Sequence, residues 1–167
     1  KNVKVSRFPL IHLDETIIAH TNLAEFRKFL QEAEDEALLD RMVIIQVPYT
    51  LSYKEEAPIY GKLCSSTQAF REVHLDPHAL HVAAVFSVLT RLSEGEDNDS
   101  LKKVRLYAGE DVEGASQSEG EKMRARNPDE GLAGVSPRFV INALSGAIIQ
   151  SQAKSLTTMD VLIALKD

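Results

Sequence analysis

The sequence predicts an α/β fragment over residues 1–50, followed by a mainly helical bundle over residues 51–167. Two runs of β-forming residues flank a stretch with helical apolar spacing in the first fifty residues. Helix-start signals then recur through the rest of the chain. A charged, glycine-containing segment at about 94–130 interrupts this helical part. The chain is therefore expected to change from mixed α/β to helical structure near residue 50.

The first part is predicted to run strand, helix, strand. Thr16–Ala19 is a short β-rich run and predicts the first strand. Asn22 then has the chemistry of a helix N-cap, and Glu25 three residues later completes a pair resembling a capping box. Apolar residues recur at helical spacing over 23–37. Residues 42–47 are nearly continuous β-formers, a pattern typical of a strand covered on both faces.

The later part contains capping residues, two of them followed by a proline that suits the first helical position. They predict helices capped by Ser52, Asp76, Ser136 and Thr158, over residues 52–65, 77–93, 137–151 and 159–165. The second of these helices is apolar nearly all round, so it is expected to be buried. Together the helices are expected to form a bundle separate from the sheet.

Residues 94–130 differ from the rest of the chain in composition. They carry eleven acidic and six basic side chains with scattered glycines. Such a composition buries too little apolar area to offset the entropy of ordering. The segment is therefore expected to be a long insertion, with one short strand at Lys103–Tyr107.

Composition also excludes several classes of function. The net charge of −6 argues against bulk electrostatic binding to nucleic acid or acidic lipid. No apolar run approaches the roughly 18 residues of a membrane span, and Cys64 is the one cysteine, so no internal disulfide exists. A reducing, cytoplasmic location is expected. Cys64 is expected to pack as a small buried hydrophobe, and the histidines at 74, 78 and 81 lack ligand spacing for zinc.

Several short words of the sequence resemble a known family. They are Thr16–Asn22, Leu38–Met42 (Leu-Leu-Asp-Arg-Met), Val47–Tyr49, Ile59–Leu63, Phe86–Leu92 and Val135–Phe139. The chain resembles the second half of an AAA+ ATPase core, and specifically that of bacterial serine protein kinases of the PrkA type. This resemblance implies late strands of a P-loop AAA+ core followed by a helical lid. No Gly-x-x-x-x-Gly-Lys-Ser/Thr loop occurs, so the chain is expected to be a piece of a larger protein.

The resemblance implies roles for three residues. Asn22 matches sensor 1, the strand-tip residue that orients the attacking water, and Arg41 matches the arginine finger presented to a neighbouring subunit. Arg138 matches sensor 2, the lid arginine that contacts nucleotide. Each also has a purely structural interpretation. Asn22 could only cap a helix, Arg41 could pair with Asp40 or a helix C-terminus, and Arg138 could be a plain surface arginine.

The intact protein is then expected to bind ATP with magnesium and to assemble as a ring-type homo-oligomer acting on a protein substrate. No nucleic acid or membrane partner is expected. By the same resemblance, the kinase-like region is expected beyond residue 167. The 167-residue chain by itself is expected to be inactive and to hold no cofactor, because it lacks the phosphate loop.

Two alternatives remain open at the level of sequence. One is an AAA+ unfoldase module of a Lon-like ATP-dependent protease, in which the same asparagine and arginines would serve a translocation motor. The other is a non-catalytic interaction module that binds a partner through residues 94–130.

Overall fold

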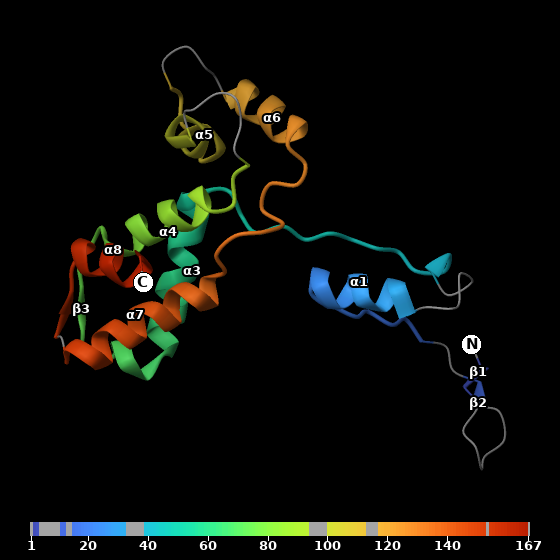
Figure 1. Ribbon diagram of the computed structural model, residues 1–167, viewed down its shortest axis with the longest axis horizontal. Coiled ribbons are helices and arrows are strands. Elements are labelled where there is room, and N and C mark those ends of the chain that lie inside the picture. Colours follow the sequence, from blue (N-terminus) through green and yellow to red (C-terminus); the bar gives the residue numbers. More distant parts are fainter. Residues whose placement is uncertain are drawn as a thin grey trace. The chain divides into compact units, whose positions relative to one another are not determined.

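The chain divides into two compact units, Lys1–Ile45 (unit 1) and Gln46–Asp167 (unit 2). The computed structural model describes residues 2–3, 11–12, 15–32, 39–93, 100–112, 117–152 and 154–166. Figure 1 shows the elements of both units, each of which is described by itself. No helix in these ranges is both long and apolar enough to cross a membrane.

Unit 1 contains a short antiparallel strand pair and one helix. Strand β1 (Asn2–Val3) pairs with β2 (Ile11–His12). Helix α1 (Leu23–Glu32) begins directly after Asn22, whose side-chain oxygen accepts a hydrogen bond from the Glu25 amide at 2.8 Å. The expected start of this helix is confirmed, and its expected continuation over 33–37 lies outside the described residues.

The two expected strands of the α/β part are wrong. Residues 15–22 and 42–50 form no helix or strand. Ile17 and Ile18 are 74% and 92% exposed, and Val43 is 88% exposed. A strand is defined by hydrogen bonds to a neighbouring strand, and β-branched composition alone provides no neighbour. No described segment pairs with either run, so the P-loop core implied by the resemblance is not seen here.

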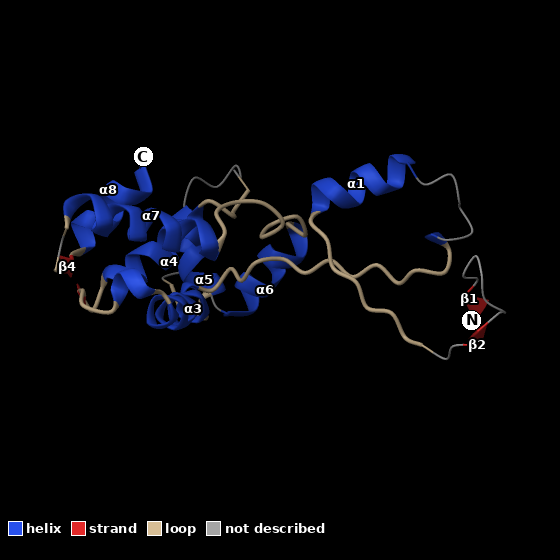
Figure 2. Cartoon of the chain, turned by 90° about the horizontal axis from the view of Figure 1, so that it is seen from below, coloured by secondary structure: helices blue, strands red, loops and turns tan. Residues whose placement is uncertain are grey.

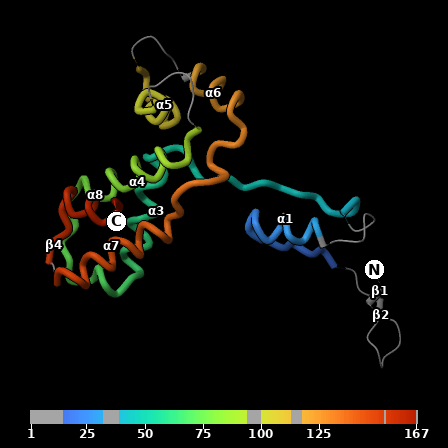
Figure 3. The backbone as a smooth tube through the Cα atoms, viewed as in Figure 1, coloured from blue at the N-terminus to red at the C-terminus, as the bar shows by residue number. Residues whose placement is uncertain are grey.

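Unit 2 is a helical bundle around one apolar core. Its principal helices are α3 (Tyr53–Ser66), α4 (Ala79–Leu89), α7 (Pro137–Ser151) and α8 (Thr158–Lys166). The core includes the fully buried residues Tyr60, Ala83, Val88, Leu144 and Val161. The tube in Figure 3 shows α3 and α4 beside α7 and α8, although these pairs are distant in sequence. The predicted bundle is therefore confirmed.

Smaller elements complete the bundle. The 3₁₀ turn η1 (Gln68–Phe70) follows α3. Strands β3 (His74–Leu75) and β4 (Ser155–Leu156) form a parallel pair, and in Figure 2 helices otherwise dominate the regular structure of unit 2. Cys64 is buried, as expected.

The helix starts agree with the sequence closely but not everywhere. Pro137 opens α7, and the Ser136 hydroxyl accepts the Phe139 amide at 3.2 Å, as expected. Helix α4 begins at Ala79, two residues later than expected, because the Asp76 side chain accepts the His78 amide and holds residues 77–78 in a turn.

The cap of the last helix was placed one residue too late. Thr157, and not Thr158, precedes the first turn of α8 and pairs with Asp160. The Asp160 carboxylate accepts hydrogen bonds from the Thr157 amide at 2.9 Å and from its hydroxyl at 2.7 Å. The Asp160 amide donates back to the Thr157 hydroxyl oxygen at 3.3 Å. This reciprocal pair is a capping box, and it decides which of two adjacent threonines serves as the cap.

The expected insertion at 94–130 is also corrected. Residues 100–107 form helix α5 (Ser100–Tyr107), not a strand, and α6 (Gln117–Arg126) follows it. Val104 and Leu106 are each 2% exposed. Five residues with Val104, Leu106 and Tyr107 between basic ones are too few to distinguish a helix from a strand, and here α5 gains its burial by packing against α4 and α6.

A buried carboxylate ties this segment to the bundle. The Glu130 side chain accepts hydrogen bonds from Lys103 Nζ at 2.6 Å and from Tyr107 Oη at 2.6 Å. It also accepts the Ser93 amide at 3.0 Å and the Ser93 hydroxyl at 2.7 Å. The number of charged residues in this segment therefore does not predict whether it is ordered. A carboxylate that accepts four hydrogen bonds can be buried, whereas an unpaired carboxylate cannot.

Gly134 occupies a position that only glycine fits. Its φ is +104°, and an added Cβ would lie 2.7 Å from the Thr90 carbonyl oxygen. Gly146, inside α7, has nothing within 4 Å of the same added atom. We expect Gly134→Ala to lower the free energy of unfolding by at least roughly 1–3 kcal/mol, through left-handed strain and backbone overlap. Gly146→Ala should be neutral or stabilising by up to about 1 kcal/mol.

Urea unfolding of the two glycine variants measures this difference. Equal midpoints and slopes for the two proteins would show that the chain near residue 134 can move away from the end of α4 at no cost.

Candidate functional site

Asn22 lies at the start of α1 in unit 1, where its side chain caps the helix. Its Oδ1 accepts the Glu25 amide, and its backbone carbonyl accepts the Phe26 amide at 2.9 Å. The side chain is exposed, so its amide nitrogen can still face a ligand. The capping interpretation is thus observed, and it is compatible with a second role as sensor 1.

Arg41 lies in a turn that follows Leu39, also in unit 1. The Met42 amide donates to the Leu39 carbonyl at 3.0 Å and closes this turn. The Arg41 side chain is exposed and forms no ion pair with Asp40 or with any other described residue. Within the described residues the Asp40 pairing is therefore not formed, and the alternatives of a helix C-terminus and of an arginine finger both stay open.

Arg138 lies in unit 2 as the second residue of α7, with an exposed side chain. No described residue accepts a hydrogen bond from its guanidinium. The N-terminal end of a helix carries a partial positive charge, so an arginine there is mildly unfavourable for stability and favourable for binding an anion. Because Asn22 and Arg41 belong to unit 1 and Arg138 to unit 2, each is described within its own unit.

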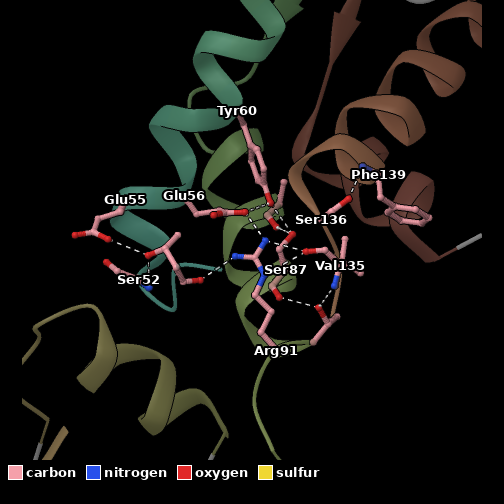
Figure 4. A network of polar contacts seen from close by, with 12 residues as sticks. Ser52, Glu55, Glu56, Tyr60, Ser87, Arg91, Val135, Ser136 and Phe139 are labelled. Atoms are coloured by element: carbon pink, nitrogen blue, oxygen red, sulfur yellow. Dashed lines mark hydrogen bonds and ion pairs between the residues drawn. The ribbon is translucent and has the colours of Figure 1, made fainter. Parts of the chain in front are cut away.

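Val135, the residue before the Ser136 cap of α7, is held by a set of four buried side chains. We call this set the Arg91 cluster (Glu56, Tyr60, Ser87 and Arg91; Figure 4). Arg91 is 3% exposed and follows the last turn of α4. Its Nη2 lies 2.5 Å from Glu56 Oε1 and 2.8 Å from the Val135 carbonyl oxygen. Its Nε contacts the same Val135 oxygen at 3.2 Å, and its Nη1 donates to the Thr50 carbonyl at 2.8 Å. One guanidinium therefore joins α3, α4, the segment before α3 and the residue preceding the Ser136 cap.

Glu56 is the buried counter-charge of this arginine. Tyr60, one turn later on α3, donates its hydroxyl to Glu56 Oε1 at 2.8 Å, and Ser87 on α4 lies 2.7 Å from the same hydroxyl. Burial raises the pKa of Tyr60, and the Glu56 carboxylate raises it further. The phenol therefore stays protonated and serves as a donor to Glu56. With these donors the carboxylate is hydrogen-bonded as well as paired, which is the condition for burying such a charge.

An open cavity of about 430 Å³ lies beside this cluster. Its wall includes Tyr49, Thr50, Glu55, Gly109 and Arg124. The Tyr49 ring also packs under the Arg91 guanidinium, 4.7 Å from its centre. The cavity presents one carboxylate and one guanidinium, so its chemistry selects neither an anion nor a cation. In the ranges that the structure covers, no three His, Cys, Asp or Glu residues lie close enough together to hold a metal ion.

Sequence reasoning missed the Arg91 cluster entirely. A signal was present, since Arg91 follows a mostly apolar helix and Glu56 and Tyr60 stand four apart on one helix face. The identity of the partners could not be read from sequence, because they lie 35 to 44 residues away from Arg91.

Residues 1–99 match the model of the PrkA AAA domain, and residues 101–167 match the model of the PrkA serine protein kinase C-terminal domain. The chain belongs to the PrkA family. The PrkA-type resemblance seen in the sequence is thereby confirmed, including its AAA-type domain.

Two curated PrkA relatives carry different functional names. The "ATP-dependent protease PrkA" of Bacillus subtilis strain 168 is 45% identical over 168 residues, which covers 99% of this chain and 26% of that protein. The "Serine/threonine kinase YeaG" of Escherichia coli K12 is 36% identical over 132 residues, covering 77% of this chain and 20% of that protein. The chain thus spans about a quarter or less of the relatives it matches. No solved structure matches it.

The expected helical lid over residues 51–167 spans both family matches, because the match to the C-terminal domain begins at residue 101. The two matches meet between α4 and α5, inside unit 2. Helices α3 and α4 from the first match and α7 and α8 from the second share one hydrophobic core.

Proposed function

We propose that this chain is part of the ATP-dependent AAA+ module of a PrkA-family serine protein kinase. The observation that carries the proposal is the match of residues 1–99 to the PrkA AAA domain. The proposed kinase activity rests on the match to the PrkA serine protein kinase C-terminal domain and on the name of the Escherichia coli relative, a serine/threonine kinase. In this proposal unit 1 supplies the end of the P-loop core and unit 2 the helical lid.

Arg138 is the part of the proposal that the structure supports best. Its guanidinium is exposed, has no partner among the described residues, and sits at the end of α7 that attracts anions. Phosphoryl transfer depends mainly on positive charge and donors placed around the phosphates. We propose that Arg138 contacts the nucleotide phosphates of its own subunit, as sensor 2 does.

Asn22 and Arg41 of unit 1 would take part in the same ATP hydrolysis. Asn22 would orient the attacking water as sensor 1, and Arg41 would reach the nucleotide of a neighbouring subunit in a ring-type homo-oligomer. ATP with magnesium would be held by the intact protein, where the bound nucleotide supplies the phosphoryl group. The partner would be a protein substrate, in the cytoplasm, with no nucleic acid and no membrane involved.

A second candidate function is the AAA+ module of an ATP-dependent protease. It is favoured by the name of the Bacillus subtilis relative, an ATP-dependent protease, which is the more similar of the two relatives described above. The two outputs differ in their products when the intact protein is incubated with ATP and a protein substrate. A kinase forms phosphoserine and leaves the substrate full-length, whereas a protease shortens the substrate.

The isolated 167-residue chain should bind ATP very weakly. It contains no Gly-x-x-x-x-Gly-Lys-Ser/Thr loop, whose backbone amides and lysine supply most contacts to the β- and γ-phosphates. Calorimetric titration of the chain with Mg·ATP tests this. Micromolar affinity would mean that these residues form a nucleotide site by themselves and would contradict the prediction that the phosphate loop is needed for binding.

Arg138→Ala in the intact protein should weaken ATP binding roughly 10- to 100-fold, since it removes a charged hydrogen-bond donor worth about 1.5–3 kcal/mol. Turnover should fall along with affinity, because a sensor contacts nucleotide in its own subunit. Arg71→Ala, a change at another exposed arginine, is the matched control and should leave both quantities unchanged. Unchanged affinity in Arg138→Ala would overturn the nucleotide-binding role of this residue.

A further inference from the structure

We propose that Arg91 is the positioning residue for Arg138: it fixes the start of α7 and so directs the Arg138 side chain toward the nucleotide. This inference rests on the proposed function of Arg138. Arg91 is buried and would touch no nucleotide itself, so its effect must pass through the backbone that it holds.

The argument begins with Val135, the residue immediately before the Ser136 cap. Its carbonyl oxygen accepts hydrogen bonds from Nη2 and Nε of Arg91 at 2.8 and 3.2 Å. Its amide donates to the Thr90 hydroxyl oxygen at 3.0 Å. Both backbone polar groups of Val135 are therefore held by two consecutive residues that follow α4.

Arg91 is itself fixed from the other side. Its Nη1 donates to the Thr50 carbonyl, its Nη2 pairs with Glu56, and its own carbonyl accepts the Gly131 amide at 3.1 Å. The position of Val135 is thereby set relative to α3 and α4, and not only by the turn that precedes it. Since Arg138 follows Val135 by three residues, in the first turn of α7, the same contacts set its direction.

The geometry also links two parts that the family models treat separately. Arg91 lies in the match to the PrkA AAA domain, and Arg138 lies in the match to the C-terminal domain. A displacement of the residues after α4 would move the start of α7 with it. The Arg91 cluster is therefore a direct mechanical connection between the AAA-type part and the C-terminal part of the chain.

The test uses the intact protein with Arg91→Lys, which keeps the positive charge but cannot bond to Thr50, Glu56 and Val135 together. Amide hydrogen exchange at residues 139–140 should accelerate by roughly fivefold or more, since one or two hydrogen bonds of about 1 kcal/mol are lost. Affinity for Mg·ATP should weaken by roughly three- to tenfold for the same reason. In an Arg138→Ala background the Arg91→Lys change should have little further effect on affinity, because the residue through which it acts is gone.

Two further variants keep the test decisive. Thr90→Val removes the hydroxyl that accepts the Val135 amide and donates to the Ser87 carbonyl of its own segment. It leaves the Arg91 contacts in place, so the variant should stay folded and show the same effects in weaker form. Val161→Ala leaves a cavity beside the buried face of α8 and lowers stability without removing any contact of Val135. It should therefore leave ATP affinity unchanged.

The outcomes separate the inference from the proposed function. Unchanged exchange at residues 139–140 in Arg91→Lys and Thr90→Val would overturn the inference, as would additive losses with Arg138→Ala. An equal loss of affinity in Val161→Ala would also overturn it, by showing a general effect of stability. A normal affinity in Arg138→Ala alone would instead overturn the nucleotide-binding role proposed for Arg138.

Discussion

Replacing Arg41 by alanine in the intact protein should lower ATP turnover far more than ATP affinity. Arginine fingers of other phosphoryl-transfer enzymes contribute roughly 10³- to 10⁵-fold to turnover, and ring ATPases can show less. The physical reason is that a finger stabilises charge in the transition state of a neighbour's nucleotide and contacts the ground state little. Steady-state turnover and equilibrium ATP binding, measured on the same preparation, separate the two effects.

A subunit-mixing experiment shows whether Arg41 acts across an interface. An Arg41→Ala subunit is combined with a subunit whose phosphate loop is broken. Activity should recover in part, at the interface where an intact finger meets an intact nucleotide site. No recovery at any mixing ratio, with assembly confirmed, would favour a local role for Arg41 at the turn after Leu39.

Replacing Glu56 by alanine should produce the largest loss of stability in unit 2. It leaves the Arg91 guanidinium buried without its counter-charge and removes the acceptor of the Tyr60 hydroxyl. Breaking a buried ion pair in this way typically costs about 3–5 kcal/mol. Denaturant unfolding of the chain, with the midpoint and slope both recorded, measures the loss.

Glu55→Ala is the matched control for this change, because it removes a carboxylate one residue earlier on the same helix. Glu55 is exposed, and among the described residues its carboxylate accepts a hydrogen bond from the Thr50 hydroxyl alone, so its loss should cost less than about 1 kcal/mol. Similar losses for Glu55→Ala and Glu56→Ala would show that the Arg91 cluster is not a buried charge pair in solution.

The helix starts show what local sequence can determine. Asn22 caps α1 and Ser136 caps α7 by accepting hydrogen bonds from amides three residues later. The contacting residues are therefore close together in the chain. The predicted start of α3 after Ser52 is also confirmed, although the Ser52 side chain makes no capping hydrogen bond. The choice of Thr157 over Thr158 was missed because both residues have the same capping chemistry, and only the pairing with Asp160 distinguishes them.

The expected strands show where local sequence is insufficient. Residues 16–19 and 42–47 have the composition of strands, but a strand also needs a partner that composition cannot supply. A strand was also expected at Lys103–Tyr107, and these residues instead form part of helix α5. Its side chains at 103 and 107 bond to Glu130, more than twenty residues away. Propensity was therefore overridden by contacts that form only in the folded chain.

For the site, the sequence determined the candidates Asn22, Arg41 and Arg138 through short family motifs, and the family itself was confirmed. Only the tertiary structure identified the group that holds the start of α7. Glu56, Arg91 and Val135 lie on segments far apart in sequence, and the family motifs that contain Arg91 and Val135 do not show that these residues are in contact. The position of Arg91 after a mostly apolar helix is a weak signal, because the burial of an arginine depends on the carboxylate and carbonyls that compensate its lost hydration, and these partners are known only from the folded structure.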